Sequence, residues 1–126
     1  MKNYIENEII LKKIKDNTPI INIDVGDLNK YDEKSLRLFF PNNVGLSLEN
    51  FLSSVREEIN ELDFRKIKEV IILCFISKDF GERVKAYDFQ NLISGIPKGV
   101  DIYYGIYIIA ENNNKLQIIF TGKYNK

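Results

Sequence analysis

The sequence predicts a small domain of the α+β class, in which helices pack on a sheet in two layers. Three observations lead to this prediction. Apolar residues recur every three or four positions in residues 48–62, which is typical of an amphipathic helix. Residues 70–76 are apolar and rich in β-branched side chains, as in a central strand that is covered on both faces. Leu116, Ile118 and Phe120 are apolar residues at every second position, the period-two pattern of a sheet face.

The N-terminal half of the chain predicts a helix, a strand and a second helix. Isoleucines at four-residue spacing predict a short helix within residues 4–15, which ends before Pro19 because the residue before a proline disfavours helix. Residues 19–25 are apolar and β-branched and predict a strand. Ser47 is the expected N-cap of the helix at 48–62. Residues 31–46 show no decisive pattern, although four apolar side chains there favour burial: Leu36, Leu38, Phe39 and Phe40.

The C-terminal half predicts a third, shorter helix over residues 86–94, which ends at the glycines and proline of residues 95–99. Residues 100–110 and 115–121 predict two long strands. The polar residues 111–114 join them, so we expect a C-terminal β-hairpin. The predicted order is helix, strand, helix, strand, helix and hairpin.

Length and charge narrow the function classes. The 126 residues fit one domain, and a formal net charge of zero argues against both disorder and nucleic-acid binding. The basic cluster of Lys12, Lys13 and Lys15 is interpreted as a solvated helix face. No apolar run approaches the ~18–20 residues of a membrane helix, and residues 1–7 are too polar for a secretory signal. We therefore expect a cytoplasmic protein that binds neither membrane nor nucleic acid.

The residue types leave little room for catalysis. The chain has no histidine and one cysteine, so it has neither the usual proton shuttle nor the ligands of a tetrahedral zinc site. Cys74 lies in an apolar run and is expected to be a small buried hydrophobe. No serine-hydrolase or phosphate-loop motif is present. We expect no catalytic site within the chain, no bound metal and no cofactor.

Two patterns are candidates for a partner-binding surface. Asn22, Asp24 and Asp27 follow a predicted strand, where their side chains either position a water or cation or cap a turn. Tyr103, Tyr104 and Tyr107 lie on a predicted strand. They form either an interface-type aromatic face, with Tyr103 and Tyr107 as its contacts, or half-buried members of an ordinary sheet.

Several landmarks occur in the order found in the C-terminal domain of the tubulin/FtsZ superfamily. Residues 14–28 resemble the entry to that domain, where a helix end leads into an Asn-x-Asp-x-x-Asp segment. The helix at 48–62, the strand at 69–77 and the helix at 87–93 resemble the elements that follow. Residues 101–106 resemble a strand that ends in an aromatic-glycine pair, and residues 118–122 a closing strand that ends in Thr-Gly.

The resemblance implies a four-stranded mixed sheet with two helices over residues 18–122, preceded by a helix in residues 1–17 and followed by a tail at 123–126. It also implies that Asn22, Asp24 and Asp27 match the loop that one subunit inserts into its neighbour's GTP pocket. The chain departs from the family pattern in two respects. The glycine-rich nucleotide-binding domain is absent, and residues 35–41 replace the small residues that follow the loop. Binding of GTP by this chain is therefore not implied.

Three functional hypotheses follow. The first is a non-enzymatic module that binds a protein partner, such as a tubulin-like GTPase, through residues 22–27. The second is an immunity or antitoxin protein that neutralises a cognate toxin. The third is a small oligomeric enzyme with a site between subunits, for which Arg56, Arg65, Arg83 and Glu82 are available. The sequence does not decide the oligomeric state.

Overall fold

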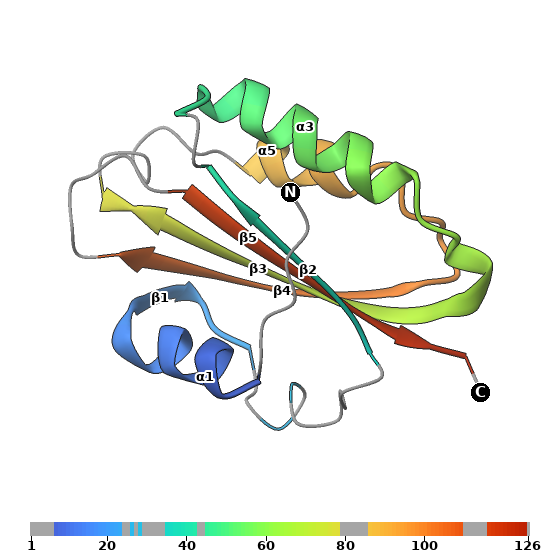
Figure 1. Cartoon of the computed structure of the whole chain (residues 1–126), viewed down its shortest axis with the longest axis horizontal. Coiled ribbons are helices and arrows are strands. Elements are labelled where there is room, and N and C mark those ends of the chain that lie inside the picture. The colour runs from blue at the N-terminus through green and yellow to red at the C-terminus, as the bar shows by residue number, and fades with distance from the viewer. Residues whose placement is uncertain are drawn as a thin grey trace.

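A mixed β-sheet forms the centre of the computed structural model (Figure 1). The structure describes residues 7–23, 26, 28, 35–42, 45–78, 86–109 and 116–125. Within this part of the chain the sheet has five strands in the order β1-β4-β3-β5-β2. They are β1 (Thr18–Ile21), β2 (Leu36–Pro41), β3 (Ile67–Ser77), β4 (Asp101–Ile109) and β5 (Leu116–Tyr124). β3 runs parallel to β4, and the other neighbouring pairs are antiparallel.

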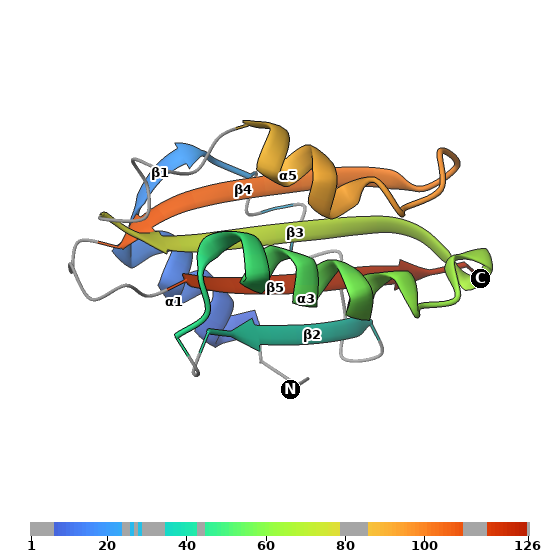
Figure 2. The same ribbon diagram turned by 90° about the horizontal axis from the view of Figure 1, so that it is seen from above.

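Helices cover both faces of this sheet. α3 (Leu48–Asn60) and α5 (Ala86–Ile93) lie side by side over one face, and α1 (Asn7–Asp16) lies against the other (Figures 1 and 2). A short 3₁₀-helix, η1 (Phe64–Lys66), leads into β3. The α+β class is confirmed, and α1 adds a partial layer to the two that were predicted.

The sheet has one strand more than the predicted four. Residues 36–41, which showed no decisive pattern, form β2 and pair antiparallel with β5. Leu38 and Phe40 pack under α3 and α5, whereas Phe39 packs on the α1 side. Because this strand carries apolar residues on both faces, its sequence lacks the alternation that identifies a half-exposed strand.

The predicted C-terminal hairpin is wrong, because β4 and β5 are not neighbours. β3 lies between them, parallel to β4 and antiparallel to β5. Every residue from Val70 to Ser77 in β3 is buried. A strand that is apolar on both faces is stabilised most when it has a partner strand on each side. The central position of β3 therefore takes precedence over direct pairing of β4 with β5, although only a short connection joins those two strands.

Two predicted boundaries also change. β1 ends at Ile21 rather than at residue 25, after a register shift between Pro19 and Ile21. Residues 123–125 of the predicted tail belong to the folded structure, because Lys123 and Tyr124 pair with β3 and the Asn125 N–H donates to the Lys66 carbonyl at 2.8 Å. These backbone bonds extend β5 beyond its apolar segment.

The predicted helices and the buried cysteine are confirmed. Ser47 caps α3 by accepting a hydrogen bond from the Asn50 N–H at 3.3 Å, and α3 buries Phe51, Leu52, Val55 and Ile59. Cys74 is 1% exposed, and its burial raises the pKa of the thiol far above the ordinary value.

The basic residues of α1 are only partly a solvated face. Lys12 is exposed and pairs with Asp16 at 3.2 Å. Lys13 reaches the sheet instead: its Nζ donates to Gln117 Oε1 at 2.8 Å and lies 5.5 Å from the centroid of the Phe75 ring. Lys13 therefore helps to hold α1 on β5 and β3, and the prediction of a fully solvated face is corrected for this residue.

None of the described helices combines the length and apolar character needed to cross a membrane.

Candidate functional site

The chain leaves the sheet at the end of β1, at the edge formed by β1 and β4. β1 pairs with the C-terminal half of β4, with Thr18 opposite Ile108 and Ile21 opposite Ile106. Pro19 is tolerated here because an edge strand does not need every N–H in a ladder. Asn22 and Ile23 follow directly, so the first residue of the Asn-x-Asp-x-x-Asp segment lies beside a strand of the sheet.

Tyr107 on β4 fixes the backbone at this point. Its side chain is 0% exposed, and its ring stacks on Phe75 with the two centroids 5.3 Å apart. The Tyr107 hydroxyl donates to Asn22 Oδ1 at 2.8 Å and accepts from the Ile23 N–H at 3.2 Å. Burial raises the pKa of this phenol. A neutral buried hydroxyl therefore satisfies two polar groups at the start of the loop.

Gly105 makes room for this arrangement. A Cβ at position 105 would lie 2.8 Å from Tyr107 Cε2 and 3.1 Å from both Ile23 Cγ2 and Leu73 Cδ2. Sequence reasoning missed the structural role of Gly105 here. A glycine inside a predicted strand is a signal of close approach by another group, so the signal was present in residues 100–110.

The structure describes only part of the predicted loop site. Asn22 is exposed and bonded to Tyr107 as stated, whereas Asp24 and Asp27 lie outside the described residues. Leu28 is 0% exposed and packs with Ile23 and Tyr107 in the cluster below α1. Two anchors, at residues 22–23 and at residue 28, thus bracket the segment that contains both aspartates.

The predicted aromatic face does not form as expected. Tyr107 is buried, so its assignment as an exposed partner contact is wrong; Phe75, Gly105 and Ile23 enclose its ring. Tyr103 and Tyr104 are each 44% exposed. Because successive side chains of a strand point to opposite faces, these two tyrosines lie on different sides of the sheet.

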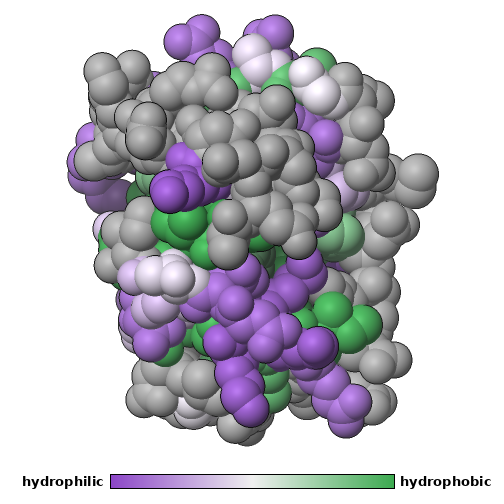
Figure 3. All heavy atoms as spheres, turned by 90° about the vertical axis from the view of Figure 1, so that its left-hand side faces the viewer, coloured by the Kyte–Doolittle hydropathy of each residue, from purple (hydrophilic) through white to green (hydrophobic). Residues whose placement is uncertain are grey.

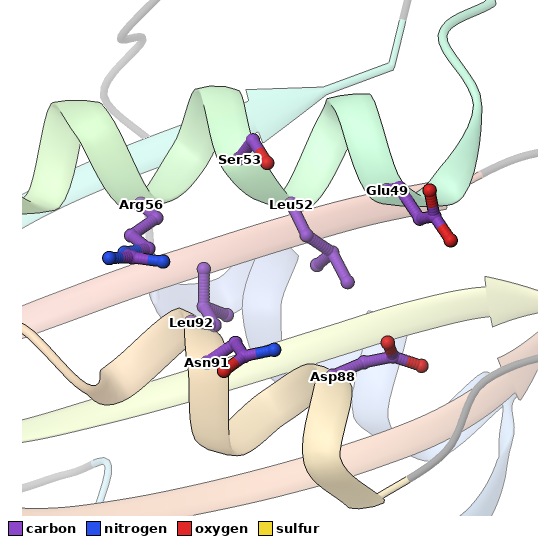
Figure 4. Close-up of a pocket in the computed structure, with 7 residues that line it drawn as sticks. All are labelled: Glu49, Leu52, Ser53, Arg56, Asp88, Asn91 and Leu92. Carbon is purple, nitrogen blue, oxygen red and sulfur yellow. The ribbon is translucent and has the colours of Figure 1, made fainter.

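A second candidate is a pocket of about 240 Å³ between α3 and α5. Figure 4 shows the carboxylates of Glu49 and Asp88 at one end and the guanidinium of Arg56 toward the other. Both acidic residues belong to the first turns of their helices, where the helix dipole favours negative charge. The remaining lining residues are Leu52, Ser53, Asn91 and Leu92.

The groups named for an enzyme site are not assembled in the described residues. Arg56 lines the pocket, while Arg65 is exposed and donates from Nε to Asp63 Oδ1 at 2.9 Å. Glu82 and Arg83 lie outside the described residues. Among the residues that the structure describes, no group of three histidine, cysteine or acidic side chains is arranged to hold a metal ion.

The end of the molecule where β3 and β4 finish is mixed in character. Figure 3 shows this end, with polar residues gathered in its lower half, where α1 lies, and hydrophobic residues visible in small separate areas. Apolar residues are common on protein surfaces and do not by themselves mark an interface.

Comparison with known proteins bears on the fold. No protein-family model matches the sequence, and no curated protein matches it either. Among solved structures, an empty FtsZ dimer from M. jannaschii matches with a TM-score of 0.54 and 13% sequence identity. The match covers 94% of this chain and 37% of the FtsZ chain, so the chain spans little more than a third of that protein's length. At this identity the likeness concerns the fold alone. The chain therefore has a fold like that of the C-terminal domain of the tubulin/FtsZ superfamily.

Proposed function

We propose that this chain is a non-enzymatic module that binds a protein partner through residues 22–27 and the adjoining sheet edge. The partner class that fits best is a tubulin-like GTPase. The fold likeness to FtsZ and the resemblance of residues 22–27 to the Asn-x-Asp-x-x-Asp segment of that family support this choice. The proposal does not require a nucleotide site within this chain.

One observation carries the proposal, and it is the pair of hydrogen bonds made by the Tyr107 hydroxyl. They tie Asn22 and the Ile23 N–H to a rigid strand. A binding loop that starts from a fixed point loses less conformational entropy when it meets a partner.

The chemistry of the segment suits action on a bound partner. Asp24 and Asp27 are the acidic groups of the loop, and a carboxylate contributed by a second protein can orient water against a γ-phosphate. In this proposal the partner holds the nucleotide, and this chain supplies only the loop. Any effect on hydrolysis therefore appears only in the complex.

The test uses a tubulin-like GTPase from the same cell. We expect the purified chain to co-sediment with the polymerised GTPase and to change its rate of GTP turnover. The double variant Asp24→Ala/Asp27→Ala should lose most of both effects. The matched control Glu57→Ala/Glu61→Ala removes two exposed carboxylates from the region of α3 and should behave like the unmodified chain.

Tyr107→Phe tests the anchor separately, because it keeps the buried ring and removes only the hydroxyl. We expect weaker co-sedimentation than for the unmodified chain but a folded protein, measured by circular dichroism. If the unmodified chain neither co-sediments nor alters turnover, the partner class is wrong. If Asp24→Ala/Asp27→Ala binds as well as the control variant, the loop is not the contact.

A further inference from the structure

The described residues cover the outer edge of β4 along only half of its length. β1 pairs with Ile106, Tyr107 and Ile108, and Ile23 lies against Gly105. Among the described residues, no strand pairs with the outer side of Asp101–Tyr104, although β3 pairs with the inner side throughout. Figure 2 shows β1 beside one end of β4 only. The uncovered stretch, Asp101–Tyr104, is called the open edge below.

The open edge has the properties of a template for another strand. Every second residue of an edge strand directs its N–H and C=O groups away from the sheet, where they can pair with an added chain. Proteins usually protect such an edge with lysine, proline or a bulge. The open edge contains no lysine or proline, its pairing with β3 has no register shift, and Asp101 at its start is its one charged residue, whereas the covered part faces Pro19 and the register shift of β1.

A tyrosine stands on each side of this edge. Tyr103 and Tyr104 are both 44% exposed and lie on opposite faces of the sheet. An added strand would place successive side chains alternately against one tyrosine and then the other. Aromatic and β-branched neighbours across strands stabilise pairing, and tyrosine is enriched at interfaces because it combines a large area with a polar tip.

The charge of Asp101, at the start of the open edge, indicates which kind of strand would bind there. Asp101 is exposed, and its neighbour across the β3–β4 ladder is a second acid, Glu69. Glu69 has Lys123 on its other side, so the acid at the outer position has no basic neighbour in the strand ladder. A strand with a lysine or arginine opposite Asp101 would supply the missing charge.

We propose that the open edge binds an extended segment of a partner protein by strand addition to β4. The segment has alternating β-branched or aromatic side chains and a basic residue that lies opposite Asp101. A second copy of this chain is a poorer occupant, because pairing of two open edges would bring no basic residue of Asp101–Tyr104 against Asp101. This inference does not rest on the proposed function, since it uses neither Asp24 nor Asp27.

The test adds a probe peptide to the full chain labelled with ¹⁵N. The probe is acetyl-TVTVKVTV-amide, and two matched peptides accompany it: one with glutamate in place of lysine, and one N-methylated at every residue. We expect the lysine peptide to slow amide exchange at alternate residues of Asp101–Tyr104. We expect it to bind about threefold more tightly than the glutamate peptide, the effect of one cross-strand charge pair. The N-methylated peptide should not bind, because it cannot complete the backbone ladder.

The charge-reversal variant Asp101→Lys should invert the preference between the lysine and glutamate peptides. Glu61→Lys is the matched control at another exposed acid and should leave the preference unchanged. Protection elsewhere on the molecule, equal binding of both peptides, or binding of the N-methylated peptide would each overturn the proposal. So would protection of these amides in the chain alone that increases with its concentration, because the occupant would then be a second copy. Failure of this test leaves the GTPase experiment unaffected.

Discussion

The two faces of the sheet are built from different chemistry. Below α3 and α5, β3 contributes Val70, Ile72, Cys74 and Ile76, all at most 1% exposed. Below α1, the buried face includes polar groups as well. Arg37, Ser77 and Thr121 alternate with residues of the first cluster, so they lie on this second face with the Tyr107 hydroxyl.

This difference between the two faces suggests that one contributes mainly to stability and the other mainly to the position of the candidate binding loop. The face below α3 and α5 is held by non-directional burial, which depends on area and packing rather than on one contact. On the α1 face, directed bonds from Tyr107 and Lys13 fix the position of one loop and one helix. We therefore expect the first face to dominate the free energy of unfolding and the second to determine how residues 22–23 are held. Four predictions test this division.

The largest effect is expected from Phe120→Ala on the face below α3 and α5. Phe120 is 0% exposed in the main cluster, so its truncation removes a large buried area and leaves a cavity. The free energy of unfolding should fall by about 3–5 kcal/mol in urea titrations. Tyr124→Ala on the same strand is the control, because Tyr124 is 42% exposed and its loss should have a far smaller effect. Similar losses for both variants would contradict the prediction.

Gly105→Ala should act on the α1 face. The new methyl group would lie within 3.1 Å of Ile23 and Leu73 and closer still to the Tyr107 ring, so the ring or the loop must move. We expect a loss of about 1–3 kcal/mol, with faster amide exchange at Ile23. Gly99→Ala is the control, since no atom lies within 4 Å of the added Cβ. An unchanged exchange rate at Ile23 would show that Tyr107 and the loop adjust without cost.

Thr121→Val should stabilise the protein. The Thr121 hydroxyl is buried and has no hydrogen-bond partner among the described residues. Valine has nearly the same shape and removes the unsatisfied group, so the free energy of unfolding should rise by about 1 kcal/mol. Thr18→Val changes an exposed threonine of β1 and should have little effect. A loss of stability in Thr121→Val would mean that the hydroxyl makes a bond outside the described residues.

The smallest effect is a dependence of stability on pH from Cys74. Burial raises the pKa of this thiol in the folded state, so the folded protein keeps its proton while the unfolded chain ionises near the ordinary pKa of 9.0. Stability from this group is therefore complete below that value and decreases as the pH rises through it. Between pH 8 and pH 9.5 the loss should be about 0.8 kcal/mol, measured by urea titration at each pH. Cys74→Ala should remove this slope, and a slope that persists would assign it to another group.

Much of the fold could be predicted because its strongest patterns are local. The spacing of Leu52, Val55 and Ile59 predicted α3, the hydroxyl of Ser47 predicted its start, and the unbroken apolar run of residues 70–76 predicted β3. β2 could not be predicted with the same methods, because burial on both faces removes the alternation that marks a strand. The neighbours of β3 could not be predicted either, since pairing between strands that are far apart in sequence leaves no local pattern.

The candidate site was predicted only at one end. Asn22 was named for its place in a polar motif, and the structure adds that it accepts a hydrogen bond from Tyr107. Tyr107 was named for the wrong reason, as an exposed contact, because a strand pattern does not reveal what covers each face. Asp24 and Asp27 lie outside the described residues, and their role stays a prediction.

The sequence by itself determined the α+β class, the positions of the helices, the burial of Cys74 and the absence of histidine. These follow from periodicity and composition, which are properties of neighbouring residues. Only the tertiary structure decided the strand order, the burial of Tyr107 against Gly105 and Phe75, and which half of β4 pairs with β1. Each of these depends on contacts between segments that are distant in sequence, and such contacts are set by how the whole core packs.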